Sequence, residues 1–133
     1  MYKINKRFQF DAAHRIWKHF GKCANIHGHT YEVIIHLKGN KLNEFNVLKD
    51  YYHFKEFKKY IDDVFDHALV IQQDDIEIIE VAKAIKTKHV ILEATTAEHL
   101  AKHLFYKAKD FYPSFIEAVE VKETQKTGAI YHE

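Results

Sequence analysis

The sequence contains few of the residues that cross-link a chain, interrupt its secondary structure or increase its flexibility. It has one cysteine, one proline and four glycines in 133 residues. A single cysteine excludes an intramolecular disulfide and is typical of a reducing compartment, so we expect a cytoplasmic protein. So little glycine and proline argues against a disordered or loop-rich chain.

Long apolar runs and charge of one sign are also absent. No apolar stretch reaches the ~18–20 residues of a membrane span, and Met1–Lys6 lacks a signal-peptide core, so no membrane partner is expected. Twenty basic residues balance 19 acidic ones, and without a basic run we expect no nucleic-acid partner. The 47% hydrophobic content is enough for a core, and the length predicts one domain over residues 1–133.

Two histidines, His27 and His29, stand just before a run that alternates from Tyr31 to Leu37. Alternation is the period of a strand, and side chains two apart on a strand project from one face. His27 and His29 can therefore converge on one point. His14 ends another alternating segment and completes the set if the two strands pair. Three neutral imidazoles with an open fourth position describe a catalytic Zn²⁺ site.

Two other interpretations of these histidines stay open. The chain holds 11 histidines, so some pair by chance, and surface or core histidines are commoner than ligands. Cys23, four residues before His27, could also be a fourth ligand in a closed structural zinc site. The pattern alone does not separate a catalytic site from a structural one.

Hydrophobic periodicity divides the rest of the chain into strands and helices. Asp50 is the expected N-cap of the first helix, and Thr95 with Glu98 has capping-box spacing at the start of the last long one. The expected strands cover residues 2–10, 27–38, 88–92, 115–123 and 129–131, the expected helices cover 50–65, 74–85 and a segment from 95 to just before Pro113, and residues 14–26 are expected to form a loop.

This order of elements predicts an α+β fold, with an antiparallel sheet and two long helices packed on one face. Uncovered sheet edges in so small a domain favour a homo-oligomer formed through sheet contacts.

Two further positions carry chemistry. Asp66 and His67 follow the first long helix and could form a proton relay, although histidine is also ordinary near a helix C-terminus. Glu123 shares a strand face with Val119 and Val121. A carboxylate on an apolar face needs a partner unless that strand end is exposed.

Taken together, these motifs resemble the 6-pyruvoyl-tetrahydropterin synthase / 6-carboxytetrahydropterin synthase family along almost the whole chain. The resemblance implies a T-fold (tunnelling fold) subunit that joins into trimers or hexamers with active sites at subunit interfaces. The matching segments are Phe10-x-Ala12-Ala13-His14-Arg15, Cys23-Ala-Asn-Ile-His27-Gly-His29, Asp66-His67, Thr96-Ala-Glu98 and Val121-Lys-Glu123-Thr124 followed by Tyr131.

Spacing within the motif helps to choose between the subfamilies. Carboxy-forming members, the queuosine-pathway enzymes, typically place three residues between the cysteine and His-Gly-His, and pyruvoyl-forming members place five. Ala24–Ile26 make three here, whereas the lead-in Phe20–Cys23 is similar to the pyruvoyl type. We give the spacing more weight because it sets where the sulfur lies relative to the metal.

The resemblance implies 7,8-dihydroneopterin triphosphate as the substrate and Zn²⁺ held by His14, His27 and His29. It also implies that Glu123 and Thr96 bind the substrate. A carboxylate suits the pterin ring because it accepts from the 2-amino group and a ring N–H together.

Cys23, and His67 oriented by Asp66, are the implied acid–base groups. The carboxy-forming reaction would release acetaldehyde and triphosphate and leave 6-carboxytetrahydropterin. A pyruvoyl-forming enzyme and a non-catalytic zinc or pterin-binding module remain the alternatives. Arg15 flanks the metal loop and could meet the triphosphate, or could simply be solvated.

Overall fold

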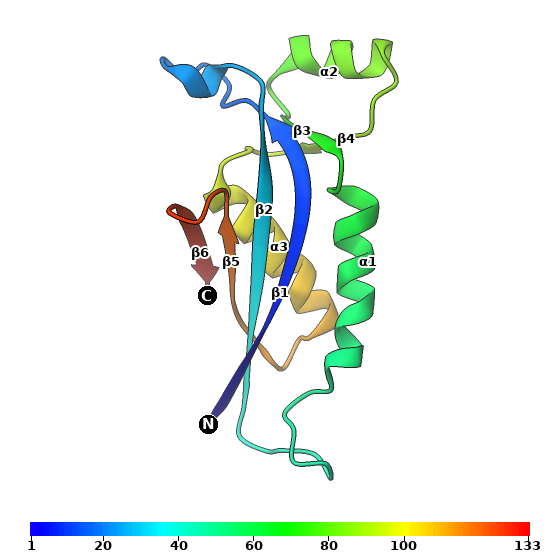
Figure 1. The fold of residues 1–133 in the computed structure, drawn as a ribbon, viewed down its shortest axis with the longest axis vertical. Helices are drawn as coiled ribbons and strands as arrows, with labels where there is room; N and C mark the ends of the chain where they lie inside the picture. Colours follow the sequence, from blue (N-terminus) through cyan, green and yellow to red (C-terminus); the bar gives the residue numbers. More distant parts are fainter.

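A computed structural model describes residues 1–133, and its centre is a six-stranded sheet with strand order β4-β3-β1-β2-β5-β6. Figure 1 shows β1 and β2 running side by side through the length of the molecule. The strands are β1 (Tyr2–His14), β2 (His27–Gly39), β3 (Ala68–Gln72), β4 (His89–Leu92), β5 (Ile116–Lys122) and β6 (Gly128–His132), and the helices are α1 (Lys55–Val64), α2 (Ile76–Ala84) and α3 (Ala97–Phe111).

The β1–β2 pair confirms the expected antiparallel strands and extends the first one beyond residue 10. Its register runs from Tyr2 opposite Gly39 to His14 opposite His27. The loop between the strands therefore starts after His14, and it carries a short 3₁₀ turn at Lys22–Ala24. Pairing of the strands brings His14 next to His27 at one end of the sheet.

The sheet is mixed, which corrects the expectation of an antiparallel one. β1, β2, β5 and β6 are antiparallel neighbours, but β3 runs parallel to β1 and β4 runs parallel to β3. β3 was not expected as a strand. Its short apolar run does not alternate, because helices cover both of its faces.

Two helices cover one face of the sheet, as expected. α1 and α3 enclose a single large core with the inward side chains of β1, β2 and β5. That core includes Phe8, Phe10, Tyr31, Val33, Ile35, Phe57, Ile61, Leu100, Leu104, Val119 and Val121. No helix is long and apolar enough to cross a membrane.

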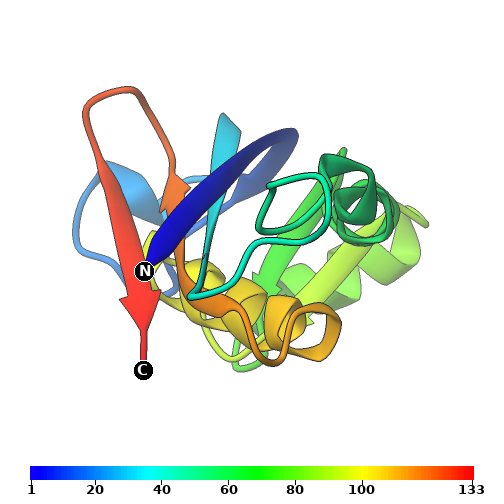
Figure 2. The same ribbon diagram turned by 90° about the horizontal axis from the view of Figure 1, so that it is seen from below.

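The third helix, α2, lies on the other face. Ile78, Ile79 and Ala82 of α2 pack against Ile71 of β3, while the neighbouring Val70 points into the main core. In Figure 1, α2 and the Lys22–Ala24 turn lie at the same end of the molecule, where the β1–β2 pair begins its loop. Seen from below in Figure 2, the C-terminal hairpin and the green α1–β4 region lie on opposite sides of the molecule.

The helix starts differ in detail from the expected caps. Asp50 makes no side-chain cap and precedes a 3₁₀ turn, Tyr51–Phe54, that leads into α1. α3 is capped by Thr96, whose hydroxyl accepts from the His99 N–H. Thr95 is therefore wrong as the cap, because its hydroxyl is already used by a residue in another part of the chain.

Candidate metal centre

The three predicted ligands, His14, His27 and His29, meet in one cluster. Their ring centroids lie 4.7, 5.0 and 5.2 Å apart. One nitrogen from each ring falls within 4.8 Å of the others, so the group can hold a metal ion. Strand pairing explains the cluster, because His14 and His27 are opposite each other and His29 follows on the same face.

Two of the rings are fixed in the tautomer that metal binding requires. The Nδ1–H of His14 donates to the Thr95 carbonyl at 2.7 Å, and that of His27 donates to the Asn25 carbonyl at 2.7 Å. A carbonyl only accepts, so Nδ1 carries the proton and Nε2 is left with its lone pair.

Burial also keeps His14 neutral. The ring is 1% exposed, and its desolvation lowers the pKa of His14 to about 4, with a smaller contribution from His27 and His29. The Nε2 atoms of His14 and His29 are buried without any hydrogen-bond partner. Unpaired buried nitrogens are costly, and a Zn²⁺ ion, which prefers neutral imidazole, would satisfy them. The donor set therefore fits zinc.

Glu123 lies directly beside this cluster, just after the end of β5. Its two carboxylate oxygens are each 3.9 Å from a ring nitrogen, one from His14 Nε2 and one from His29 Nε2. That is beyond hydrogen-bond distance, so both oxygens keep their capacity to accept from a ligand. Glu123 and Thr96 also line one cavity of about 210 Å³. The structure thus brings together the two residues expected to bind substrate.

Cys23 lies in the loop between the two histidine strands, on the 3₁₀ turn, and is exposed. Its backbone carbonyl accepts from the Ile16 N–H at 2.7 Å, which closes the loop at its base. The sulfur is not among the ligand atoms that lie within 4.8 Å of one another. This geometry does not support Cys23 as a fourth ligand of a closed site.

The Asp66–His67 pair is formed but stands apart from the cluster. His67 Nδ1 lies 2.9 Å from the Asp66 carboxylate, whose pKa is lowered by the Asp11 backbone N–H and by His67. His67 has a φ of 61° and lines a cavity of about 630 Å³ with Asp11, Thr30 and one member of the cluster, His29. Asp11 and Thr30 alternate with the core residues of their strands, so their side chains lie on the opposite face of the sheet from His14. Of the three cluster histidines, only His29 lines this cavity.

The structure also shows a support that the sequence analysis missed. Arg15 is engaged with Asp75 by two hydrogen bonds, of 2.8 and 2.7 Å, and so it is not a free cation beside the metal loop. Thr95 contacts both His14 and Arg15 through its backbone and side chain. Asp75 and Thr95 lie about 60 and 80 residues from Arg15 in the chain, so no local sequence pattern predicts these contacts.

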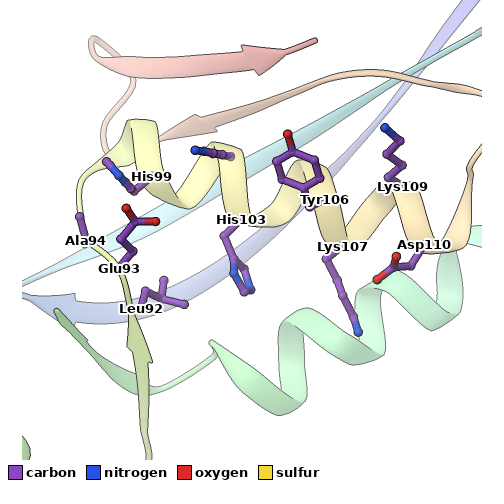
Figure 3. Close-up of a pocket in the computed structure, with 10 residues that line it drawn as sticks. Leu92, Glu93, Ala94, His99, His103, Tyr106, Lys107, Lys109 and Asp110 are labelled. Atoms are coloured by element: carbon purple, nitrogen blue, oxygen red, sulfur yellow. The ribbon is translucent and has the colours of Figure 1, made fainter. Parts of the chain in front are cut away.

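A separate hollow of about 430 Å³ runs along α3, and no predicted site residue lines it. In Figure 3, His103 and Lys107 point toward α1, whereas Tyr106 and Lys109 point the other way. His103 contacts the Tyr60 hydroxyl, Lys107 lies over the Tyr60 ring, and Lys109 pairs with Glu133. Lys107 and Lys109 are thus already engaged within the chain, and we assign no function to this hollow.

The fold and the cluster together define a class: an α+β protein with a three-histidine cluster that can hold a metal ion and a glutamate, Glu123, beside it that lines a cavity. Residues 3–133 match the family described as 6-pyruvoyl tetrahydropterin synthase. The chain belongs to this family.

Relatives agree with this assignment. The 6-carboxy-5,6,7,8-tetrahydropterin synthase of Rickettsia conorii is 39% identical over 78% of each chain. That of Haemophilus influenzae is 32% identical over 100% of each.

Among solved structures, the 6-pyruvoyl tetrahydropterin synthase of Caenorhabditis elegans superposes with a TM-score of 0.76 at 25% identity, covering 99% of this chain and 95% of the other. An uncharacterized protein of Wolinella succinogenes has a TM-score of 0.84 at 24% identity, over 99% and 98%. These neighbours confirm the expected T-fold.

Proposed function

We propose that the protein is a zinc-dependent lyase of the 7-deazapurine (queuosine) pathway. It converts 7,8-dihydroneopterin triphosphate to 6-carboxy-5,6,7,8-tetrahydropterin and releases acetaldehyde and triphosphate. The observation that carries the proposal is the cluster of His14, His27 and His29 with Glu123 beside it. The names of the Rickettsia and Haemophilus relatives and the three-residue spacing after Cys23 support the carboxy-forming product.

The three histidines would hold Zn²⁺, which when bound supplies Lewis acidity toward the hydroxyls of the substrate side chain. Glu123 binds the pterin ring by accepting from the 2-amino group and the adjacent ring N–H. Thr96, which lines the same cavity, contributes a hydroxyl at the start of α3. This anchoring directs the side chain of the substrate toward the histidines.

Cys23 and His67 move the protons. His67 holds its Nδ1 proton against Asp66, so its Nε2 is free to accept or return a proton. Cys23 acts as the second acid–base group from the loop between the histidine strands. Asp66 sets the ring orientation of His67 and does not itself need to meet the substrate.

The active site is shared between subunits. His67 pairs with Asp66 and lines a cavity with Asp11 and Thr30 of the opposite sheet face, and we infer that it serves the cluster of a neighbouring copy in a homo-oligomer, a trimer or a hexamer. The outer strands β4 and β6 each leave one edge without a strand partner in the chain, and such edges favour pairing between copies.

Mixing two inactive variants tests this arrangement. Cys23→Ala and His67→Ala should each be inactive alone, and co-refolded mixtures should regain activity because some sites combine an intact Cys23 with an intact His67. Mixtures of Cys23→Ala with His14→Ala serve as the control and should stay inactive, since those residues belong to one subunit's side. An inactive Cys23→Ala plus His67→Ala mixture would contradict the shared site.

A pyruvoyl-forming synthase is the second candidate. The description of the matching family and the name of the Caenorhabditis elegans neighbour favour it. Both reactions use the same residues, so the products separate them. Removal of zinc by a chelator should abolish consumption of the substrate in either case, and restoring zinc should recover it. Substrate consumption that persists without metal would refute the zinc-dependent proposal.

A further inference from the structure

We infer that Thr95, held in place by Arg15 and Asp75, positions His14 for metal binding. None of these three residues is a metal ligand. The inference rests on the proposed metal site. It attributes part of the zinc affinity of that site to contacts made by residues at the start of α2 and just before α3.

Thr95 contacts the end of β1 at two successive residues. Its carbonyl accepts from His14 Nδ1 at 2.7 Å, and its hydroxyl donates to the Arg15 carbonyl at 2.9 Å. The residue is 1% exposed, so water does not replace either contact. A ring fixed by one hydrogen bond could still tilt with its strand, but here the same residue also holds the strand. His14 Nε2 is therefore fixed in direction as well as in tautomer.

Arg15 and Asp75 secure this arrangement from the other side. The Arg15 Nε and Nη2 donate to the two oxygens of Asp75 at 2.8 and 2.7 Å. A bidentate pair of this kind fixes the guanidinium plane. Asp75 is 2% exposed and caps α2 by accepting from the Ile78 N–H. The ion pair thus joins the backbone beside His14 to a helix on the opposite face of the sheet.

Two substitutions at Thr95 separate positioning from packing. Thr95→Val keeps the volume and loses the hydroxyl, whereas Thr95→Ser keeps the hydroxyl and loses a methyl group. Both variants keep the Thr95 carbonyl that accepts from His14. If the hydrogen bond from the Thr95 hydroxyl to the Arg15 carbonyl helps to position His14, Thr95→Val should weaken zinc binding by about 10- to 100-fold, the range for partners of metal ligands. Thr95→Ser should then bind zinc nearly as the wild type does. If Thr95 only fills space, the order reverses.

Zinc affinity is measured by competition with a chromophoric chelator on the whole chain, with thermal unfolding of each metal-free variant alongside. The absorption spectrum of the Co²⁺-loaded protein reports the ligand geometry directly. We expect an altered Co²⁺ spectrum for Thr95→Val and an unaltered one for Thr95→Ser.

Arg15→Lys extends the test to the ion pair, and it keeps the inference falsifiable if Thr95→Val does not fold. Lysine retains the charge but not the fork, so zinc affinity should fall by about tenfold or more. Arg7→Lys is the matched control, because Arg7 is also an arginine paired with a carboxylate, that of Glu32. Zinc affinity should not change in Arg7→Lys.

Wild-type zinc affinity in both Thr95→Val and Arg15→Lys would overturn this inference and leave the metal site standing. A wild-type protein that binds no zinc would overturn the metal site itself, and this inference with it.

Discussion

The buried, neutral His14 predicts a specific acid sensitivity of the metal-free protein. In the unfolded chain this histidine titrates near 6.5, but burial lowers its pKa to about 4 in the folded protein. Between these values the unfolded chain binds more protons than the folded one, so protonation favours unfolding. The contribution of His14 to stability is complete above pH 6.5 and is lost as the pH falls toward 4.

The size of the effect follows from the two pKa values. The difference between 6.5 and about 4 corresponds to roughly 3 kcal/mol at 1.36 kcal/mol per pH unit. Most of this, about 2–3 kcal/mol, falls between pH 7.5 and pH 4.5. Since domains are stable by only about 5–15 kcal/mol, the loss should be plain in the free energy of unfolding.

Urea denaturation of the chelator-treated protein at pH 7.5 and pH 4.5 measures this loss. His14→Asn is the comparison, because asparagine does not titrate and its amide nitrogen, which takes the position of the histidine Nδ1, can still donate to the Thr95 carbonyl. Other groups, such as the buried His103, whose pKa is also lowered by desolvation, contribute equally to both proteins. The wild type should lose about 2–3 kcal/mol more than His14→Asn. An equal loss in the two proteins would refute the reasoning.

Three further predictions concern single residues. Glu123→Gln offers the pterin ring one acceptor in place of two, so KM should rise by about 10- to 100-fold with zinc content unchanged; an unchanged KM would exclude Glu123 as the anchor. Cys23→Ala should lower kcat by at least about 10²-fold while elemental analysis finds zinc still bound; loss of the metal would favour the structural-zinc alternative. Phe57→Ala removes a fully buried ring of the main core and should lower the free energy of unfolding by about 3–5 kcal/mol in urea titrations; a cost under 1 kcal/mol would contradict the core described.

The histidine cluster could be predicted from the sequence because alternation assigns side chains to the two faces of a strand. His27 and His29 follow directly from the strand period, and His14 follows once the two strands are paired. The structure places all three together. The convergence of these three side chains therefore follows from the sequence pattern.

Strand β3 could not be predicted from the sequence in the same way. Alternation marks a strand only when one face is exposed, and Ala68–Gln72 packs on both faces. Its apolar run directly follows α1 and His67, whose positive φ lies where the chain turns from helix to strand. Neither feature has a sequence signature strong enough to separate the strand from the end of a helix.

Long-range polar contacts explain the remaining differences. Two adjacent threonines precede α3, and Thr95 had the capping-box spacing, but the Arg15 carbonyl takes its hydroxyl and Thr96 caps the helix instead. Arg15 likewise finds Asp75 rather than solvent. The face on which Asp66 and His67 lie also depends on how β3 joins the sheet, which no local pattern gives.

Product analysis tests the central claim most directly. Zinc-loaded protein is incubated with 7,8-dihydroneopterin triphosphate, the pterin is identified by mass spectrometry, and acetaldehyde is assayed in the same sample. The proposed function predicts 6-carboxytetrahydropterin with a matching amount of acetaldehyde. A pyruvoyl product without acetaldehyde would assign the protein to the pyruvoyl-forming subfamily, and substrate left unconsumed would contradict a catalytic role altogether.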